Sequence, residues 1–133
     1  MRTVVHVSDL HFGRVDPELL APLRSAIARQ RPDVLVVSGD LTQRARRAQF
    51  RAARDFLATL PTPQVVVPGN HDVPFYDVVR RFLAPLDRFR RYITADPMPE
   101  FRDGEIAVVG VNTARSLTFK GGRINVDQVR EVA

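Results

Sequence analysis

Three short runs of apolar, mainly β-branched residues alternate with two longer segments in which apolar residues recur at helical spacing. The runs cover residues 3–7 (TVVHV), 34–38 (VLVVS) and 64–67 (QVVV), and helices are expected over 17–31 and 43–60. Short connections in such an alternation are typical of right-handed βαβ crossovers, which build a parallel sheet. The second and third runs are almost wholly apolar, as in strands covered on both faces. The sequence therefore predicts an α/β fold with a mostly parallel sheet joined by βαβαβ crossovers.

The later part of the chain carries weaker signals. A third helix is expected from about Tyr76 to Tyr92, followed by a proline-rich loop and a fourth strand over residues 106–111. The sequence FKGG (119–122) predicts a turn. Asn125 with Gln128 three residues later resembles a capping box, which predicts the start of a short helix.

Composition limits the class of protein. At 133 residues the chain is long enough for one domain, spanning 1–133. A hydrophobic content of 44% supplies a core, and the absence of cysteine excludes a disulfide, a thiolate metal site and a cysteine nucleophile. The sequence shows neither a signal peptide nor an apolar run near the roughly 18 residues of a membrane helix. We therefore expect a cytoplasmic protein with no membrane partner.

The formal net charge is +5, and nearly all of the positive charge is arginine, because Lys120 is the only lysine. The arginines are spread along the predicted helices with apolar residues between them, as in RARRAQFRAAR (44–54). This pattern indicates solvated helix faces more than a nucleic-acid surface, so nucleic acid is not the expected partner. The charge would still help to attract a phosphorylated substrate.

A polar cluster follows each of the first three predicted strands: SDLH (8–11), SGD (38–40) and GNHD (69–72). Parallel strands end at one edge of the sheet, where open α/β sheets bind their ligands, so the three clusters should converge. Any single member is explained as well by a cap or a turn. Three clusters on one edge, two of them with histidine, favour a binding site. The side chains expected to meet there are Asp9, His11, Asp40, Asn70, His71 and Asp72.

Carboxylates, an amide oxygen and an imidazole form a hard-to-borderline set of metal ligands. This set suits Mn(II), Fe(II/III), Zn(II) or Mg(II). Without an ion the two aspartates would repel each other, and a divalent ion removes that cost. Two ions about 3.5–4 Å apart can share one carboxylate and one hydroxide, which attacks phosphorus in line with the leaving oxygen. A centre of this kind would hydrolyse phosphoesters.

The motifs D-x-H (Asp9, His11), G-D (Asp40) and G-N-H-D (69–72), in this order and each after a strand, resemble those of the calcineurin-like metallophosphoesterases. The stretches GDLTQ, VVVPGNHDVP and VVGVNTAR look most like the bacterial branch related to class III cyclic-nucleotide phosphodiesterases. The resemblance covers the whole chain. It implies an α/β/β/α sandwich, two divalent metal ions and a small phosphorylated substrate, with cyclic nucleotides among the candidates.

The resemblance also implies roles for the metal ligands. Asp9 and His11 would bind the first metal ion. Asp40 would bridge both ions. Asn70 would bind the second ion and contact the substrate.

The resemblance implies catalytic roles for His71 and Asp72, and three further residues follow predicted strands or loops near the site. His71 would face the substrate and either stabilise the phosphoryl group or protonate the leaving oxygen, and Asp72 would help to orient it. Arg14 could bind a phosphate or be a solvated loop arginine. Asn112 and Arg115 after the fourth strand either line the substrate side or form a turn.

The sequence departs from the family pattern in its second half. The family completes its dinuclear site with later histidines, including a G-H-x-H motif, whereas this chain holds only His6, His11 and His71. His6 lies among valines in the first strand, where a structural role is expected. We therefore expect the N-terminal half of a phosphoesterase domain, truncated before the C-terminal histidine motifs, with an incomplete second metal site. The second sheet is expected to be missing, and the exposed sheet would favour a homo-oligomer.

Three functions stay open at this point. The first is a metal-dependent phosphoesterase, or half of one. An alternative enzyme is a DNA exonuclease-type phosphoesterase, which shares the motifs and would need a DNA-facing surface. The alternative from another class is a non-catalytic metal- or phosphate-binding fragment, or a chain completed by a partner subunit, which the missing histidines favour.

Overall fold

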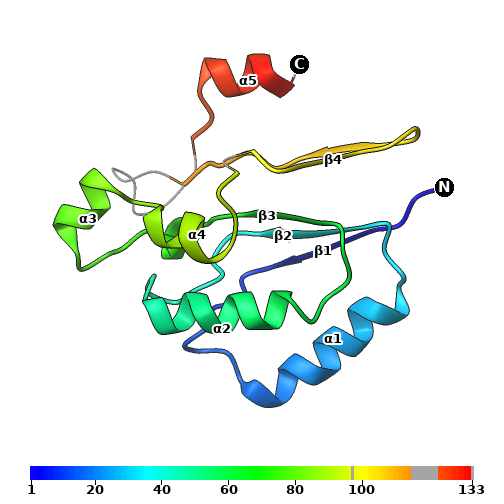
Figure 1. The fold of residues 1–133 in the computed structure, drawn as a ribbon, viewed down its shortest axis with the longest axis horizontal. Helices are drawn as coiled ribbons and strands as arrows, with labels where there is room; N and C mark the ends of the chain where they lie inside the picture. The colour runs from blue at the N-terminus through cyan, green and yellow to red at the C-terminus, as the bar shows by residue number, and fades with distance from the viewer. Residues whose placement is uncertain (97, 115–122, 133) are drawn as a thin grey trace.

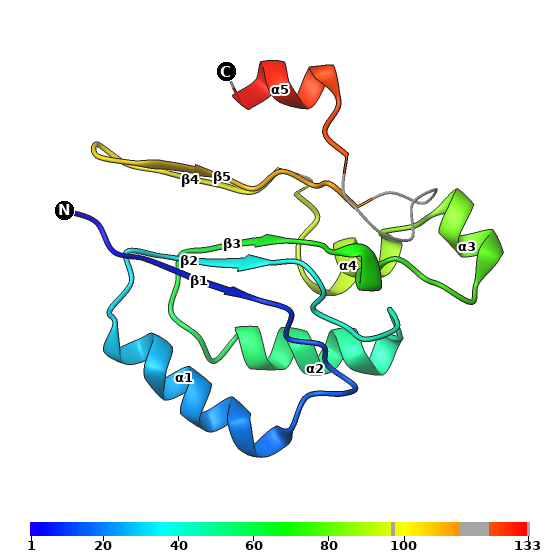
Figure 2. The ribbon, with the colours of Figure 1, turned by 180° about the vertical axis from the view of Figure 1, so that it is seen from behind.

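A parallel sheet with helices on one face forms the main body of the protein (Figure 1). The computed structural model describes residues 1–96, 98–114 and 123–132. The sheet is three-stranded, and its order is β1 (Val4–Ser8), β2 (Val34–Ser38), β3 (Gln64–Val67). Helices α1 (Leu20–Arg29) and α2 (Arg47–Leu57) cover one face of it, as Figures 1 and 2 show from opposite sides. The predicted α/β class with βαβαβ crossovers is confirmed.

The strand register brings the three strand ends level with one another. Both pairings are parallel, and Ser8 at the end of β1 lies opposite Ser38 at the end of β2. Ser38 in turn lies opposite Val67, the last residue of β3. The loops that follow these strands therefore start at the same edge of the sheet.

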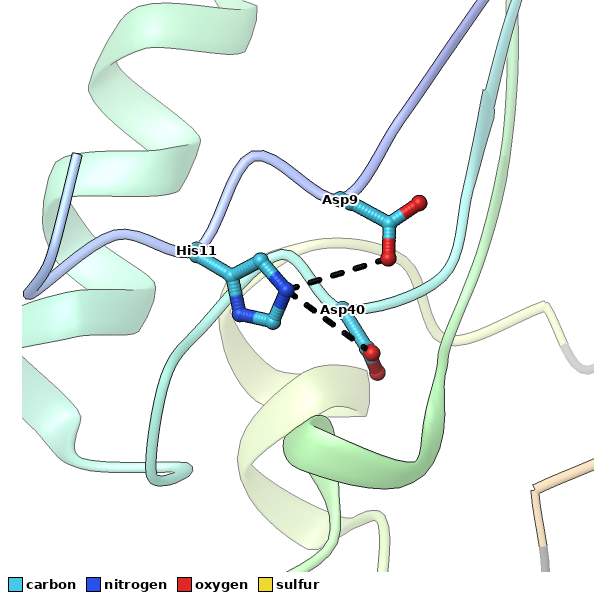
Figure 3. A group of neighbouring side chains, drawn as sticks. All are labelled: Asp9, His11 and Asp40. Carbon is cyan, nitrogen blue, oxygen red and sulfur yellow. Dashed lines mark ion pairs between the residues drawn. The ribbon is translucent and has the colours of Figure 1, made fainter. Parts of the chain in front are cut away.

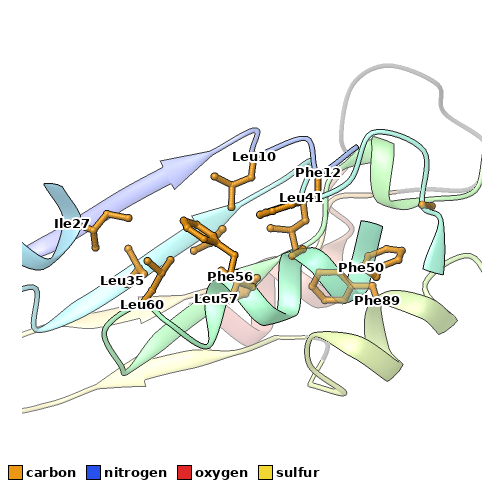
Figure 4. Close-up of a cluster of buried hydrophobic side chains, with 14 residues drawn as sticks. Leu10, Phe12, Ile27, Leu35, Leu41, Phe50, Phe56, Leu57, Leu60 and Phe89 are labelled. Atoms are coloured by element: carbon orange, nitrogen blue, oxygen red, sulfur yellow. The ribbon is translucent and has the colours of Figure 1, made fainter. Parts of the chain in front are cut away.

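The hydrophobic core lies between the sheet and helices α1 and α2 (Figure 4). Only every second side chain of a strand enters this core, because successive side chains point to opposite faces of a sheet. Each fully buried leucine or phenylalanine contributes about 1.5–3 kcal/mol relative to leaving it exposed. Core residues from the strands and the two helices include Leu35, Val37, Val66, Ile27, Phe50 and Phe56.

The first helical segment begins where its Asp-Pro sequence predicts. Asp16 is the N-cap, and its Oδ1 accepts a hydrogen bond of 3.0 Å from the backbone N–H of Glu18. One 3-10 turn, Pro17–Leu19, precedes α1. Proline fits there because the first backbone N–H groups of a helix have no partner within it.

Helix α2 begins later than residue 43, where the sequence predicts it. Ala45 has a φ of 50°, a left-handed conformation that an α-helix cannot include. The side-chain oxygen of Gln49 accepts hydrogen bonds from the backbone N–H groups of Arg44 and Arg46, at 2.9 and 3.4 Å. These bonds cap α2 at Arg46 and leave residues 43–46 in the loop after β2.

The single helix predicted from Tyr76 to Tyr92 is wrong. The structure has two short helices, α3 (Val78–Leu83) and α4 (Asp87–Tyr92), separated by Pro85. Proline has no backbone N–H, and it disfavours helical geometry in the residue before it. Ala84 accordingly has a φ of −150° and a ψ of 62°.

A two-stranded antiparallel sheet forms from segments that the sequence assigns to a loop and to one longer strand. It pairs β4 (Glu100–Arg102) with β5 (Ala107–Val109). Between the strands, Asp103 Oδ1 accepts hydrogen bonds from the backbone N–H groups of Glu105 and Ile106, at 2.7 and 2.9 Å. The fourth strand predicted over 106–111 is therefore shorter, and its partner lies in the predicted loop.

This hairpin lies on the face of the main sheet opposite α1 and α2 (Figures 1 and 2). Its backbone lies close to β3, since a Cβ placed on Gly110 would come 2.6 Å from Val67 Cγ1. The expectation that the second sheet is missing is thus wrong. The hairpin does not cover this face of the main sheet completely, however, because Val4 of the edge strand β1 remains 45% exposed.

The last helix, α5 (Val126–Val132), opens with the predicted capping box. The backbone N–H of Gln128 donates to Asn125 Oδ1 at 2.8 Å, and that of Asn125 donates to Gln128 Oε1 at 3.0 Å. The turn predicted at 119–122 and the residue Arg115 lie outside the described residues. Within the described ranges, no helix has the length and apolarity needed to cross a bilayer.

Candidate metal centre

The loops after β1, β2 and β3 are joined by backbone hydrogen bonds that continue beyond the strands. Asp9 N–H donates to the carbonyl of Gly39 at 3.3 Å, and His11 N–H donates to the carbonyl of Asp40 at 2.9 Å. The loop after β2 is tied to β3 by a bond of 3.0 Å from Gly39 N–H to the Val67 carbonyl. The polar clusters that follow the strands are therefore held side by side.

Asp9, His11 and Asp40 lie together at this edge of the sheet (Figure 3). One ligand atom from each lies within 4.8 Å of the other two. His11 Nε2 is 3.7 Å from Asp9 Oδ1 and 4.0 Å from Asp40 Oδ2. These two contacts, dashed in Figure 3, are ion-pair contacts that exceed hydrogen-bond length, so His11 Nε2 makes no hydrogen bond to either carboxylate.

All three residues have left-handed backbone conformations. Their φ angles are 57° for Asp9, 46° for His11 and 48° for Asp40. This region is sparsely populated by residues other than glycine, although Asp and His enter it more often than most. Each such residue costs about 1–3 kcal/mol, and such conformations cluster at active and ligand-binding sites. These three backbone conformations therefore lower the stability of the fold, and they accompany the convergence of the three side chains.

The geometry of the cluster fits a divalent metal ion. Nitrogen and oxygen ligands lie about 2.1 Å from Zn(II), so two ligands of one ion are at most about 4.2 Å apart. The separations at His11 Nε2 are within this limit. Within the described part of the chain, His11 Nδ1 is buried and has no hydrogen-bond partner. An imidazole nitrogen that faces two carboxylates at these separations is a donor set that a divalent ion can complete.

Asp40 is the most buried member of the cluster, and its second oxygen is fixed by the loop after β3. Asp40 Oδ1 accepts a hydrogen bond of 2.9 Å from the backbone N–H of His71. Gly69 makes this approach feasible, because a Cβ at that position would lie 2.2 Å from both Asp40 N and Asp40 Oδ1. A glycine at position 69 is therefore a steric requirement of the site.

Asn70 lies beside the cluster. It lines a cavity of about 440 Å³ whose wall also contains Asp9, Asp40 and Gly69. Its side-chain oxygen is a hard donor of the kind that Mg(II) and Mn(II) accept. The structure thus brings together the four residues expected to bind metal.

His71 makes a contact that fixes its ring. Its Nδ1 lies 2.9 Å from the backbone carbonyl oxygen of Gln43. A carbonyl oxygen can only accept, so Nδ1 carries a proton and Nε2 is the nitrogen left for other contacts. The ring packs edge-on to His11, with centroids 5.0 Å apart and an interplanar angle of 83°.

Asp72 links the loops after β2 and β3. It is buried, and its carboxylate accepts hydrogen bonds from Gly69 N–H, Leu41 N–H, Thr42 N–H and the Thr42 hydroxyl. Burial raises the pKa of Asp72 to about 6, although the hydrogen bonds from Gly69, Thr42 and Leu41 oppose that shift. The expected contact with the His71 ring is absent from these bonds. The orienting contact comes from Gln43 instead.

The family assignment agrees with this arrangement. The family model for calcineurin-like phosphoesterases matches residues 2–133. The chain belongs to this family. The resemblance in the three motifs is confirmed, and the family is typically built around a dinuclear metal centre.

Three curated relatives match part of the chain. The glycerophosphodiester phosphodiesterase GpdQ of Enterobacter lignolyticus is 34% identical over 82 residues, covering 52% of this chain and 29% of the relative. A Synechococcus protein named "Probable cyclic nucleotide phosphodiesterase" is 32% identical over 84 residues, covering 54% and 32%. The UDP-2,3-diacylglucosamine pyrophosphatase LpxG of Chlamydia muridarum is 32% identical over 76 residues, covering 55% and 23%. The match thus spans less than a third of each of these phosphoesterases.

Other residues that the sequence singles out lie outside the cluster. Arg14 is exposed and lines a neighbouring cavity with Arg44 and Arg46. His6 Nε2 bonds to Ser38 Oγ at 2.6 Å, in agreement with a structural role. Asn112 Oδ1 accepts from the backbone N–H of Ala114 at 3.0 Å, which is a turn contact.

Sequence reasoning misses two residues that support the candidate site. Gln43 acts through its backbone carbonyl, for which residue type gives no signal. Thr42 pairs with Asp72 across a separation of 30 residues, which only the folded chain reveals.

Proposed function

We propose that this chain is a metal-dependent phosphoesterase in which Asp9, His11, Asp40 and Asn70 hold divalent ions. The observation that carries the proposal is the convergence of Asp9, His11 and Asp40 within 4.8 Å in a member of this family. Two bound ions would lower the pKa of water and neutralise charge on the phosphoryl group. The hard and borderline donors support Mn(II), Fe(II/III), Zn(II) or Mg(II).

The residues of the chain then have distinct tasks. Asp40 is the proposed ligand of both ions, because its Oδ2 faces His11 and the hydrogen bond from the His71 backbone to its Oδ1 keeps the carboxylate in place. His71 is suited to act on the substrate, because Gln43 holds its Nδ1 and leaves Nε2 available. Through Nε2, His71 either stabilises the phosphoryl oxygens or gives a proton to the leaving oxygen. Asp72 has a positioning role, since it fixes the two loops.

The proposed substrate is a small phosphodiester. The names of two relatives, a glycerophosphodiester phosphodiesterase and a probable cyclic nucleotide phosphodiesterase, support this class. Arg14 is the proposed contact for a further anionic group of the substrate, through the cavity that it lines. The proposed setting is cytoplasmic, the default for a chain that forms no disulfide.

A second candidate function is non-catalytic binding of a metal ion or phosphate. It is favoured by the donor set, because two carboxylates, one imidazole and one amide are enough for one ion and too few for two. In this reading the chain supplies part of a dinuclear site, and its three histidines leave the second position incomplete.

Self-association is proposed through the uncovered face of β1, where Val4 is 45% exposed. An edge strand with apolar exposure favours pairing with another copy. Val4→Lys should then convert a dimer into a monomer in light scattering, and a monomeric unsubstituted chain would contradict the pairing.

The activity test uses bis(p-nitrophenyl) phosphate with Mn(II). We expect turnover by the unsubstituted chain and its loss in Asp40→Asn. The matched control is Asp55→Asn, which removes an exposed carboxylate from the outer face of α2. A folded chain that binds Mn(II) without turnover would favour the non-catalytic function, and equal turnover in both variants would reject the proposed site.

A further inference from the structure

A cavity beside the metal cluster is lined by aromatic and cationic side chains. Its volume is about 330 Å³, and its wall includes Asn70, His71, Phe75, Tyr76 and Arg44. This volume is within the range of sites that bind small molecules. The proposed catalytic steps give no task to Phe75, Tyr76 or Arg44.

Phe75 and Tyr76 form an exposed aromatic wall. Their ring centroids are 5.0 Å apart at an interplanar angle of 77°, which is the edge-to-face arrangement that aromatic pairs favour. The two residues are 54% and 71% exposed. Adjacent aromatic rings left this exposed, at the rim of a cavity, indicate a surface that a ligand covers.

The charge of this cavity favours an anion. The guanidinium carbon of Arg44 lies 5.5 Å from the centroid of the Tyr76 ring, a cation–π contact that positions both groups. Arg81 is buried and also lines the cavity, where its Nη1 donates to the Pro74 carbonyl at 3.2 Å. Among the described residues, no carboxylate lines this wall. Positive charge therefore accompanies the aromatic surface.

Asn70 connects the aromatic cavity with the metal cluster. It lines both this cavity and the one that contains Asp9 and Asp40. His71 also lines the aromatic cavity. Its Nε2, the ring nitrogen that Gln43 does not hold, faces the leaving oxygen in the proposed reaction. A phosphoryl group at the cluster would thus extend its ester group past His71 toward Tyr76.

We propose that this cavity is the leaving-group subsite of the phosphoesterase and that it selects esters whose alcohol carries an aromatic ring. The proposal rests on the proposed function, because a leaving group exists only if the chain hydrolyses esters. In the reaction, the oxygen of water becomes bonded to phosphorus and the P–O bond to the aromatic alcohol breaks. One proton of that water ends on the alcohol oxygen by way of His71. Tyr76 and Phe75 are specificity residues.

Binding tests the subsite without turnover. The full chain with Mg(II) is titrated by NMR with phenyl phosphate and with methyl phosphate, which carry the same charge. We expect phenyl phosphate to shift the Tyr76 ring resonances and to bind about five-fold tighter. Tyr76→Leu should remove that preference, whereas Phe82→Leu, at a 55% exposed position of α3 outside this wall, should keep it. Equal affinities, or a preference that survives Tyr76→Leu, would overturn the proposal.

Kinetics separate this inference from the proposed function. Tyr76→Leu should lower kcat/KM about five-fold for an aryl diester and leave a glycerophosphodiester within about two-fold. If the unsubstituted chain hydrolyses neither ester but still prefers phenyl phosphate, the aromatic binding site stands and the proposed hydrolysis fails. If both esters are hydrolysed and Tyr76→Leu affects them equally, the hydrolysis stands and the subsite is rejected.

Discussion

The carboxylate of Asp72 accepts two hydrogen bonds from Thr42, at 2.8 Å from its backbone N–H and 2.9 Å from its hydroxyl. Two more, from Leu41 and Gly69, complete the link between the loops that carry the metal cluster. This buried carboxylate therefore determines how the loop after β2 faces the loop after β3. The site depends on a residue that does not contact the proposed metal ions.

Replacing Asp72 should destabilise the fold. Asp72→Asn exchanges one acceptor oxygen for a donor and leaves buried N–H groups unpaired, which costs about 1–3 kcal/mol. The amide also escapes the desolvation that raises the pKa of Asp72 to about 6, so the net loss should fall in the lower half of that range. Urea unfolding measures this loss of unfolding free energy. The control, Asp55→Asn at an exposed position, should change the free energy of unfolding by less than about 0.5 kcal/mol. An Asp72→Asn chain as stable as the control would contradict this role.

Gly69 and Gly104 form a matched pair for testing the steric requirement of the site. A Cβ at Gly69 would lie 2.2 Å from Asp40 Oδ1, whereas a Cβ at Gly104 has nothing within 4 Å. Gly69→Ala should displace Asp40 and weaken Mn(II) binding by about 10–100-fold, as loss of supporting contacts around metal ligands does. Gly104→Ala should leave the affinity unchanged. Equal affinities in isothermal titration would show that the Gly69 contact does not matter.

His71 should affect turnover and leave metal binding intact. Its Nδ1 is held by the Gln43 carbonyl, and the proposed function places its Nε2 against the substrate. We expect His71→Asn to lower kcat by roughly 10²–10⁴-fold, the usual contribution of a general acid. Metal content by mass spectrometry should equal that of the unsubstituted chain. Loss of bound metal in proportion to lost turnover would make His71 a ligand instead.

Acid stability should depend on Asp33. The hydrogen bond from Thr3 N–H, with Arg2 adding to it, holds the pKa of Asp33 below its usual value of 3.8. A lowered pKa means that the ionised form stabilises the fold above about pH 4, and that this stability is lost as the pH falls through the lowered value. The difference in unfolding free energy between the unsubstituted chain and Asp33→Asn should therefore shrink from pH 6 to about pH 2. A difference that stays constant with pH would exclude the linkage.

The sequence predicts the main sheet because its signals are local. Strands 34–38 and 64–67 have the predicted bounds, since apolar runs are stopped by Gly39 and Pro68. The break at Pro85 was also a local signal, and the prediction of one long helix overlooked it. The hairpin could have been predicted from Asp103-Gly104, a pair that is common in tight turns.

The remaining features of the fold and the site depend on backbone geometry or on contacts between distant residues. The late start of α2 follows from the left-handed Ala45 and the Gln49 contacts, which apolar spacing does not encode. Convergence of Asp9 with Asp40 follows from parallel topology, so the sequence could indicate it. The links from Asp72 to Thr42 and from His71 to Gln43 join loops about 30 residues apart and emerge only in the folded chain.

Metal titration tests the central claim most directly. Calorimetry with Mn(II) should detect at least one ion per unsubstituted chain. That binding should be lost in Asp40→Asn and retained in Asp55→Asn, because only Asp40 faces His11 and Asp9. Equal Mn(II) affinity in both variants, or none in the unsubstituted folded chain, would contradict the account.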